Sequence, residues 1–121
     1  MKRIVFFLAF LFVVTSVFAA SNISPEDAIN HIGEEATVCG TVASTKYATR
    51  SNKQPTFLNL NRPFPNHIFT VLIWGSDRSK FSNPPEVYYN NKKICVSGKI
   101  IQYKGTPEII VMNPSQIKEM R

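Results

Sequence analysis

The sequence predicts an all-β domain with a minor helical part, built as a small closed barrel of five strands. Short segments rich in β-branched and aromatic residues recur along the chain between Gly, Pro and Asn turn signals. Two of them, Ala36–Tyr47 and Lys92–Tyr103, share a plan with one cysteine and a nearby glycine. We expect these two segments to be neighbouring strands, each bent at its glycine.

The first 19 residues are predicted to be a secretory signal peptide, which leaves residues 20–121 as a single domain. Lys2 and Arg3 precede an unbroken apolar run, Ile4–Val14, and Ala19 offers a small residue for cleavage. A membrane anchor is the alternative reading. It is disfavoured because the run is shorter than the ~20 apolar residues that a spanning helix needs. The sequence therefore predicts a secreted or periplasmic protein without an integral membrane segment after cleavage.

The two cysteines, Cys39 and Cys95, both fall in the predicted mature domain. Export to an oxidising compartment favours a disulfide, and two cysteines allow a single pairing. Closing a loop of about 56 residues would stabilise the fold by at most ~4 kcal/mol in the chain-entropy model. Two free, buried thiols are the alternative. A metal site is disfavoured because no His or further Cys lies at ligand spacing.

Charge and motif content limit the functional classes. Loss of Lys2 and Arg3 with the signal peptide lowers the formal net charge from +6 to +4, which permits a polyanionic partner without requiring one. The chain has no HExxH, no nucleophile elbow and no phosphate-cradling glycine loop. His31, His67 and Glu108 each lack a partner for acid–base catalysis. We expect a protein that is not an enzyme and that uses no cofactor or metal.

The predicted elements begin with a short helix. Ser24 is a suitable N-cap, Pro25 suits the first helical position, and Gly33 is placed to end the helix. The apolar residues Ala28, Ile29 and Ile32 would form the stripe that covers one end of the barrel.

Five strand segments follow, joined by recognisable turns. The basic, polar loop Ala48–Pro55 lies between the first two strands, and the two prolines of Arg62–Asn66 fix the next turn. Gly75–Phe81 is expected to form a short helical turn, which Pro84 and Pro85 prevent from continuing. The last two strands form a hairpin across Lys104–Pro107. The predicted strands are Ala36–Tyr47, Thr56–Asn61, His67–Trp74, Lys92–Tyr103 and Glu108–Met112.

Five strands with a helical element between the third and fourth are the plan of an OB-fold (oligonucleotide/oligosaccharide-binding fold). A small immunoglobulin-like sandwich is the alternative, disfavoured because it needs more strands. The segments Val38–Val42, Pro55–Trp74, Ile94–Ile100 and Tyr103–Ile109 together resemble small bacterial OB-fold domains regarded as nucleic-acid-binding. Such domains occur alone behind a signal peptide or attached to extracytoplasmic nucleases. The resemblance covers about Ile32 to Ile117 and implies the fold, whereas OB-folds bind many ligand classes.

OB-folds bind ligands on the outer face of the second and third strands, between two flanking loops. Alternation places Leu58, Leu60, Phe69, Val71 and Ile73 in the interior. The opposite side chains and the two loops then form the candidate site. Its predicted residues are Phe57, Asn59, Thr70 and Trp74 on the strands, Lys46, Tyr47, Arg50 and Lys53 at the first loop, and Tyr103 and Lys104 at the second.

Aromatic side chains within a basic frame suit single strands, because bases stack on the rings while cations contact phosphates. A register error of one residue would instead place Phe57 and Trp74 in the core, and Arg50 and Lys53 would be ordinary solvated loop residues. The sequence thus predicts an exported, non-catalytic module that binds single-stranded DNA or RNA with little sequence preference. The alternative is a module that binds a protein, a peptide or a cell-envelope component. An accessory subunit of a separate nuclease is compatible with both.

Overall fold

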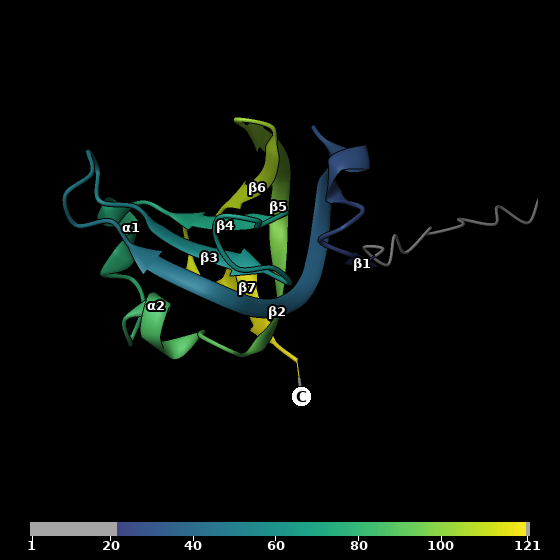
Figure 1. Ribbon diagram of the computed structural model, residues 1–121. Coiled ribbons are helices and arrows are strands. Elements are labelled where there is room, and N and C mark those ends of the chain that lie inside the picture. Colours follow the sequence, from purple (N-terminus) through teal and green to yellow (C-terminus); the bar gives the residue numbers. More distant parts are fainter. Residues whose placement is uncertain (1–21, 121) are drawn as a thin grey trace, which may run out of the picture.

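The computed structural model describes residues 22–120, which form a barrel with short additions at its edges (Figure 1). The strand order is β1-β2-β3-β4-β6-β5-β7, and an additional pairing of β2 with β5 closes the ring. The antiparallel β2-β3-β4 run and the parallel pairing of β4 with β6 are those of an OB-fold. The predicted fold class is confirmed. The barrel strands are β2 (Glu35–Tyr47), β3 (Thr56–Leu60), β4 (Thr70–Ile73), β5 (Lys93–Tyr103) and β6 (Thr106–Ile110).

The two cysteine-containing segments are neighbours, as predicted. Cys39 of β2 lies opposite Cys95 of β5 in the antiparallel register, and the two form a disulfide across 56 residues of chain. The bond links the pair of strands that closes the barrel. The irregularity in β2 lies between Val42 and Ser44, slightly beyond Gly40, where the bend was expected.

The barrel interior follows the predicted alternation. Leu58 and Leu60 of β3, Val71 and Ile73 of β4, and Phe69 just before β4 are all fully buried. Val38 and Val42 of β2, Ile94, Val96 and Ile100 of β5, and Ile109 of β6 belong to the same core. The register of β3 and β4 is therefore the one that the sequence predicts, which places the next residues along each strand on the outer surface.

The N-terminal segment covers the barrel less extensively than predicted. A short strand, β1 (Asn22–Ile23), pairs with β2, and a single 3₁₀ turn, η1 (Ala28–His31), follows. Ala28 is fully buried, but Ile29 and Ile32 are 44% and 38% exposed. The expected three-residue stripe was wrong, because one 3₁₀ turn presents too little of its surface to the barrel.

The insert contains one helix more than expected. α1 (Gly75–Arg78) is the expected helical turn, and it ends before Pro84 and Pro85. Pro85 also opens a second helix, α2 (Pro85–Tyr88), since proline is well suited to the first turn. Beyond the hairpin, η2 (Pro114–Gln116) leads into β7 (Ile117–Glu119), which pairs with β5.

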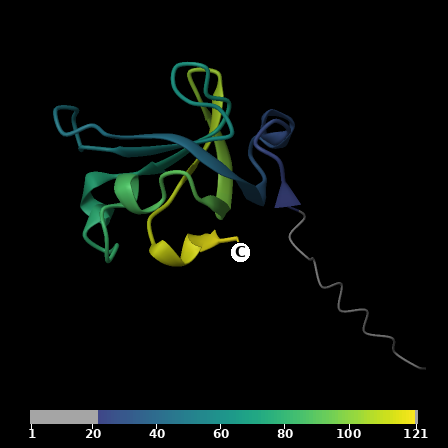
Figure 2. The same cartoon turned by 60° about the horizontal axis from the view of Figure 1, so that its bottom comes forward.

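The boundaries of two strands are displaced by two or more residues from the predicted ones. β4 begins at Thr70 rather than at His67. β6 begins at Thr106 because Lys104 and Gly105, with φ of 47° and 81°, make a two-residue hairpin turn. The β5–β6 hairpin and the β3–β4 loop lie close together on one side of the barrel, with α1, α2 and β7 on the other side (Figure 2).

The predicted signal peptide, residues 1–19, lies outside the described residues. Within residues 22–120, no helix has the length and apolar character needed to cross a membrane.

Candidate functional site

The outer surface of β3 and β4 carries two rows of side chains set by the strand register. Lys46, Phe57 and Leu72 lie side by side across β2, β3 and β4 and form the first row. The neighbouring row crosses β2, β3, β4 and β6 and is polar. This polar row consists of Ser44, Asn59, Thr70 and Glu108.

The polar row is joined by side-chain hydrogen bonds. The Thr70 hydroxyl donates to Asn59 Oδ1 at 2.8 Å, and Asn59 Nδ2 donates to Ser44 Oγ at 3.0 Å. Asn59 and Thr70 are each only 5% exposed. Both lie on the predicted face, but they are covered and bonded to each other, so they form the floor of the face rather than its contact surface.

Glu108 ends the polar row and differs from its other members. It pairs with Thr70 in the β4–β6 register and is 7% exposed, yet among residues 22–120 its carboxylate has no hydrogen bond or ion pair. Loss of solvent raises the pKa of this carboxyl above its ordinary value of 4.5. A buried carboxylate without a partner destabilises the fold. Sequence reasoning noted Glu108 but gave it no role, since only the register reveals its neighbours.

The β3–β4 loop lies against the polar row and presents an aromatic ring. The backbone N–H of Phe64 donates to Ser44 Oγ at 3.0 Å, while the Phe64 side chain is 71% exposed. Its ring stacks on His67 at 5.5 Å between centroids. Arg62–Asn66 was predicted only as a turn, and Phe64 was not among the predicted site residues. The available signal was a phenylalanine between two prolines, which cannot easily enter a strand.

Trp74 and Lys53 form one aromatic–cation pair at the end of β4. Lys53 Nζ lies 5.7 Å from the centre of the indole ring, within the range of a cation–π contact, and Trp74 is half-buried. The Gly75 N–H donates to the Lys53 carbonyl at 2.9 Å. A Cβ at Gly75 would lie 2.7 Å from that oxygen, so glycine allows this loop to pack beside the tryptophan. Arg50 is exposed in the same loop.

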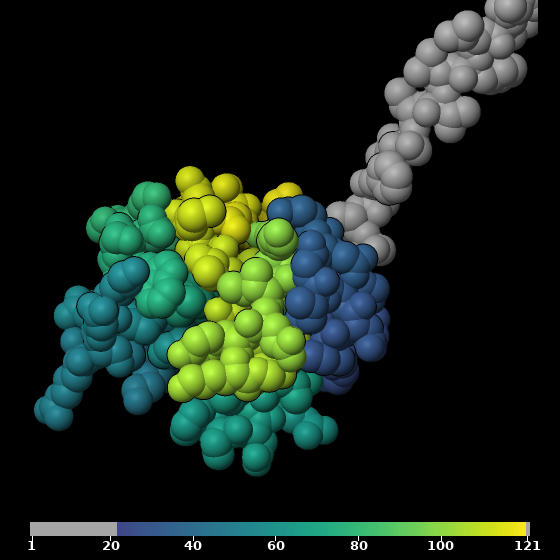
Figure 3. All heavy atoms as spheres, turned by 90° about the horizontal axis from the view of Figure 1, so that it is seen from above, coloured from purple at the N-terminus to yellow at the C-terminus, as the bar shows by residue number. Residues whose placement is uncertain are grey.

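Tyr103 and Lys104 form a second aromatic–cation pair at the β5–β6 turn. Tyr103 is 60% exposed, and Lys104 Nζ lies 5.5 Å from the centre of its ring. Figure 3 shows this hairpin (lime) against the β3–β4 loop (teal), with the β2–β3 loop projecting to one side. The structure therefore flanks the β3–β4 face with loops that carry aromatic and basic side chains.

Tyr47 does not join the other predicted site residues. The Arg78 guanidinium lies 3.7 Å from the centre of its ring, and the same guanidinium donates to Thr56 Oγ1 at 3.0 Å. Tyr47 is thus held against the helical insert, whereas Lys46, the preceding residue of β2, is exposed beside Phe57 on the candidate face.

Charges are distributed unequally between this face and the rest of the barrel. Among residues 22–120, the basic side chains within ion-pair distance of a carboxylate are His31, Arg78, Lys80 and Lys92. The basic side chains around the candidate face take part in no ion pair with a described residue. They are Lys46, Arg50, Lys53, Arg62 and Lys104.

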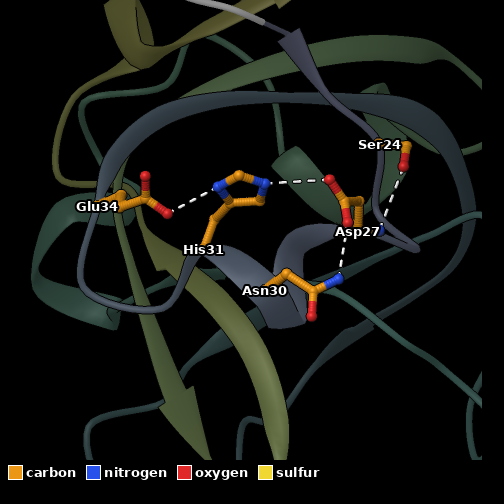
Figure 4. Close-up of polar contacts among 5 residues, drawn as sticks. All are labelled: Ser24, Asp27, Asn30, His31 and Glu34. Carbon is orange, nitrogen blue, oxygen red and sulfur yellow. Dashed lines mark hydrogen bonds and ion pairs between the residues drawn. The ribbon is translucent and has the colours of Figure 1, made fainter.

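The N-terminal segment, in contrast, is acidic and internally paired. His31 lies between two carboxylates, with Nε2 3.0 Å from Asp27 Oδ2 and Nδ1 2.7 Å from Glu34 Oε2 (Figure 4). Asn30 also donates to Asp27, at 2.7 Å. The hydrogen bonds to Asp27 and Glu34 raise the pKa of His31, and those from Asn30 and His31 lower the pKa of Asp27. These contacts account for His31 as a local structural residue.

Chemically, the candidate face offers stacking rings, cations and hydrogen-bonding groups. Within residues 22–120, no three His, Cys, Asp or Glu side chains are grouped as metal ligands would be. The arrangement is suited to holding a ligand.

Solved structures share the fold at low sequence identity. A protein described as an aspartyl-tRNA synthetase from Leishmania major Friedlin matches with a TM-score of 0.53 at 10% identity, over 88% of this chain and 22% of that one. Asparaginyl-tRNA synthetase from Pyrococcus horikoshii matches with a TM-score of 0.53 at 12% identity, over 84% and 23%. The chain thus spans less than a quarter of the length of either synthetase.

An OBody, AM1L10, solved bound to hen egg-white lysozyme, also has a similar structure. Its TM-score is 0.52 at 16% identity, over 82% of this chain and 90% of that one. No family model matches the sequence, and no curated protein matches it. The similarities establish an OB-fold.

Proposed function

We propose that this protein is an exported, non-catalytic OB-fold module that binds single-stranded nucleic acid with little sequence preference. The ligand would lie across the outer face of β3 and β4, between the β2–β3 loop and the β5–β6 hairpin. The Cys39–Cys95 disulfide supports an oxidising, extracytoplasmic location, because such bonds are rare in the cytosol.

The observation that carries this proposal is the pairing of an aromatic ring with a cation on both flanks of the face. Trp74 lies beside Lys53 and Tyr103 beside Lys104. A ring offers stacking to any base, and a neighbouring cation can contact the adjoining phosphate. This combination suits a single strand, because in a duplex the bases are already stacked on each other.

The ion pairs on the other surfaces of the barrel also support binding at this face. Asp27 and Glu34 of the N-terminal segment contact His31, and Asp77, Glu86 and Glu119 each have a basic partner. The cations around the face are therefore free to attract phosphates. The synthetases with a similar fold act on tRNA according to their names, which agrees with a nucleic-acid ligand but establishes the fold alone.

A protein or peptide ligand is the second candidate, and one observation favours it. Phe64 is 71% exposed on a loop anchored to Ser44, as an aromatic anchor for a protein partner would be. The OBody bound to lysozyme has the same fold. A partner such as an extracytoplasmic nuclease would fit this reading.

Fluorescence anisotropy of a labelled thymidine 11-mer tests the first proposal. We expect binding at low salt, and a log–log plot of affinity against salt with a negative slope, because phosphate contacts release counterions. The triple variant Arg50→Ala, Lys53→Ala, Lys104→Ala should flatten this slope by about two units, roughly 0.7 for each lost contact to a single strand.

The matched control removes cations from another surface. Lys93 and Lys118 are exposed and take part in no ion pair with a described residue, and Lys118 pairs with Cys95 in the β5–β7 register. The double variant Lys93→Ala, Lys118→Ala should leave the slope within about one unit of the wild type. Absence of binding at low salt, or equal losses in both variants, would reject the proposed face. If a partner protein is still captured in a pull-down after nuclease treatment of the sample, the second candidate is favoured.

A further inference from the structure

The polar row contains a carboxylate that has no hydrogen-bond partner. Glu108 is 93% removed from solvent, and among the described residues its carboxylate has no partner. Among residues 22–120, one polar side-chain atom is both fully enclosed and without a partner, and it is His67 Nδ1 rather than an oxygen of Glu108. The Glu108 oxygens are unpaired but not fully enclosed, so they must still open to the outer surface.

The register places this carboxylate on the candidate face rather than in the barrel. Ile109, the next residue, is fully buried in the core, so Glu108 points to the opposite side of β6. Its neighbour Thr70 donates its hydroxyl proton to Asn59 and therefore has none to offer Glu108. Ser44, Asn59 and Thr70 are joined by hydrogen bonds, whereas the Glu108 carboxylate remains available to accept one from a ligand.

An open carboxylate restricts which part of a nucleic acid can approach it. It repels phosphates and favours groups that donate hydrogen bonds. The Watson–Crick edge of guanine presents two adjacent donors, the ring N1–H and the exocyclic N2 amino group, which match the two oxygens of a carboxylate. Thymine and uracil offer one N–H between two carbonyls, while adenine and cytosine place an acceptor beside their amino group.

We propose that Glu108 recognises guanine, so that the face prefers a guanine base at one position of an otherwise freely chosen single strand. This inference rests on the proposed function, since it names the base that the same face selects. The strand would turn a guanine edge towards Glu108, and its phosphates would lie outward near the flanking cations.

Oligonucleotides that differ in one base test this directly. The probes are a thymidine 11-mer and the same 11-mer with a central guanine or a central hypoxanthine, which lacks the N2 amino group. The assays are run at about pH 8, well above the ordinary pKa of a glutamate, to favour the carboxylate form of Glu108. We expect the guanine probe to bind about 5- to 100-fold more tightly than the thymidine probe, with hypoxanthine between them.

The variant Glu108→Gln keeps the size of the side chain and replaces one acceptor by a donor. In this variant the ratio of guanine to thymidine affinity should fall below about two. The control Glu35→Gln changes an exposed carboxylate at the far end of β2 and should keep the wild-type ratio. Thermal unfolding of both variants checks that they are folded.

Three outcomes would overturn the inference, and they can be told apart. Equal wild-type affinity for all three probes rejects guanine recognition but leaves the proposed function standing. A guanine preference that persists in Glu108→Gln rejects Glu108 as its source. If no probe binds at low salt, the proposed function fails and the inference fails with it.

Discussion

The helical-insert side of the barrel and the outer face of β3 and β4 each hold a carboxylate removed from most solvent, and they treat it in opposite ways. On the insert side, Arg78 donates to Glu86 through both terminal nitrogens, with Nη2 2.7 Å from Oε1. The pKa of Glu86 is therefore lowered. On the outer face, no described residue bonds to Glu108, and burial raises its pKa.

The difference teaches how to separate structural from functional polar groups in this protein. The insert network is complete, since the Arg78 guanidinium also contacts Thr56 Oγ1 and the ring of Tyr47. A complete network stabilises one conformation and leaves nothing for a ligand. An incomplete network reduces stability, and such features in natural proteins concentrate at functional sites.

The largest expected effect comes from the disulfide, which lies in the β2–β5 pair that closes the barrel around both regions. The double variant Cys39→Ser, Cys95→Ser should lower the free energy of unfolding by about 4 kcal/mol, because the bond closes a 56-residue loop. Urea unfolding with and without reductant measures this. The disulfide contacts neither Glu86 nor Glu108. The oligonucleotide affinity of the folded fraction should therefore stay unchanged.

The next largest effect is expected from a substitution that removes Arg78 from the insert network. Arg78→Ala should lower the free energy of unfolding by about 3 kcal/mol, because it leaves Glu86 without its partner in a site where both side chains are less than 20% exposed. Urea unfolding again gives the value. The salt dependence of oligonucleotide binding should match that of the wild type. A loss below about 1 kcal/mol would show that the network contributes no more than an exposed ion pair.

Glu108→Gln should have a smaller effect of the opposite sign. Replacing an unpaired buried carboxylate by a neutral amide should raise the free energy of unfolding at pH 7 by about 1 kcal/mol. The exposed Glu35→Gln change provides the control and should shift stability by less than about 0.5 kcal/mol. A destabilised Glu108→Gln protein would mean that the carboxylate supports the fold.

The smallest effect is a difference in pH dependence. The raised pKa of Glu108 means that its stabilising contribution is present below about pH 4.5 and is lost as pH rises through its folded value. The lowered pKa of Glu86 means that its contribution is present above about pH 4.5 and is lost as pH falls. Thermal melts between pH 3 and 8 should thus show a smaller decline on the alkaline side for Glu108→Gln. For Glu86→Gln, the acid decline should be smaller; identical profiles would contradict this assignment.

The sequence predicted the barrel well because alternation and turn residues are local signals. Leu58, Leu60, Val71 and Ile73 follow the two-residue period, and the matched positions of Cys39 and Cys95 indicated the strand pair that closes the ring. The sequence did not predict the second helix of the insert. Pro85 was expected only to stop the preceding helical turn, but a proline also suits the first turn of a helix, and α2 begins there.

The candidate site was predictable only in part, since its character depends on contacts between segments distant in the sequence. The face of Phe57, Asn59 and Thr70 follows from alternation, but the bonds that cover Asn59 and Thr70 do not. The engagement of Tyr47 by Arg78, 31 residues later, has no local signature. The isolation of Glu108 is equally hidden, because it is defined by partners that are missing.

Chemical-shift mapping of the ¹⁵N-labelled protein with the thymidine 11-mer tests the central claim most directly. If the outer face of β3 and β4 binds single strands, the amides of Phe57, Trp74, Lys53 and Tyr103 should shift as the oligonucleotide is added, and the Trp74 indole N–H should shift with them. The amides of α2 and β7 should stay within error of their free positions. Shifts confined to α2 and β7, or no shifts at low salt, would contradict the account.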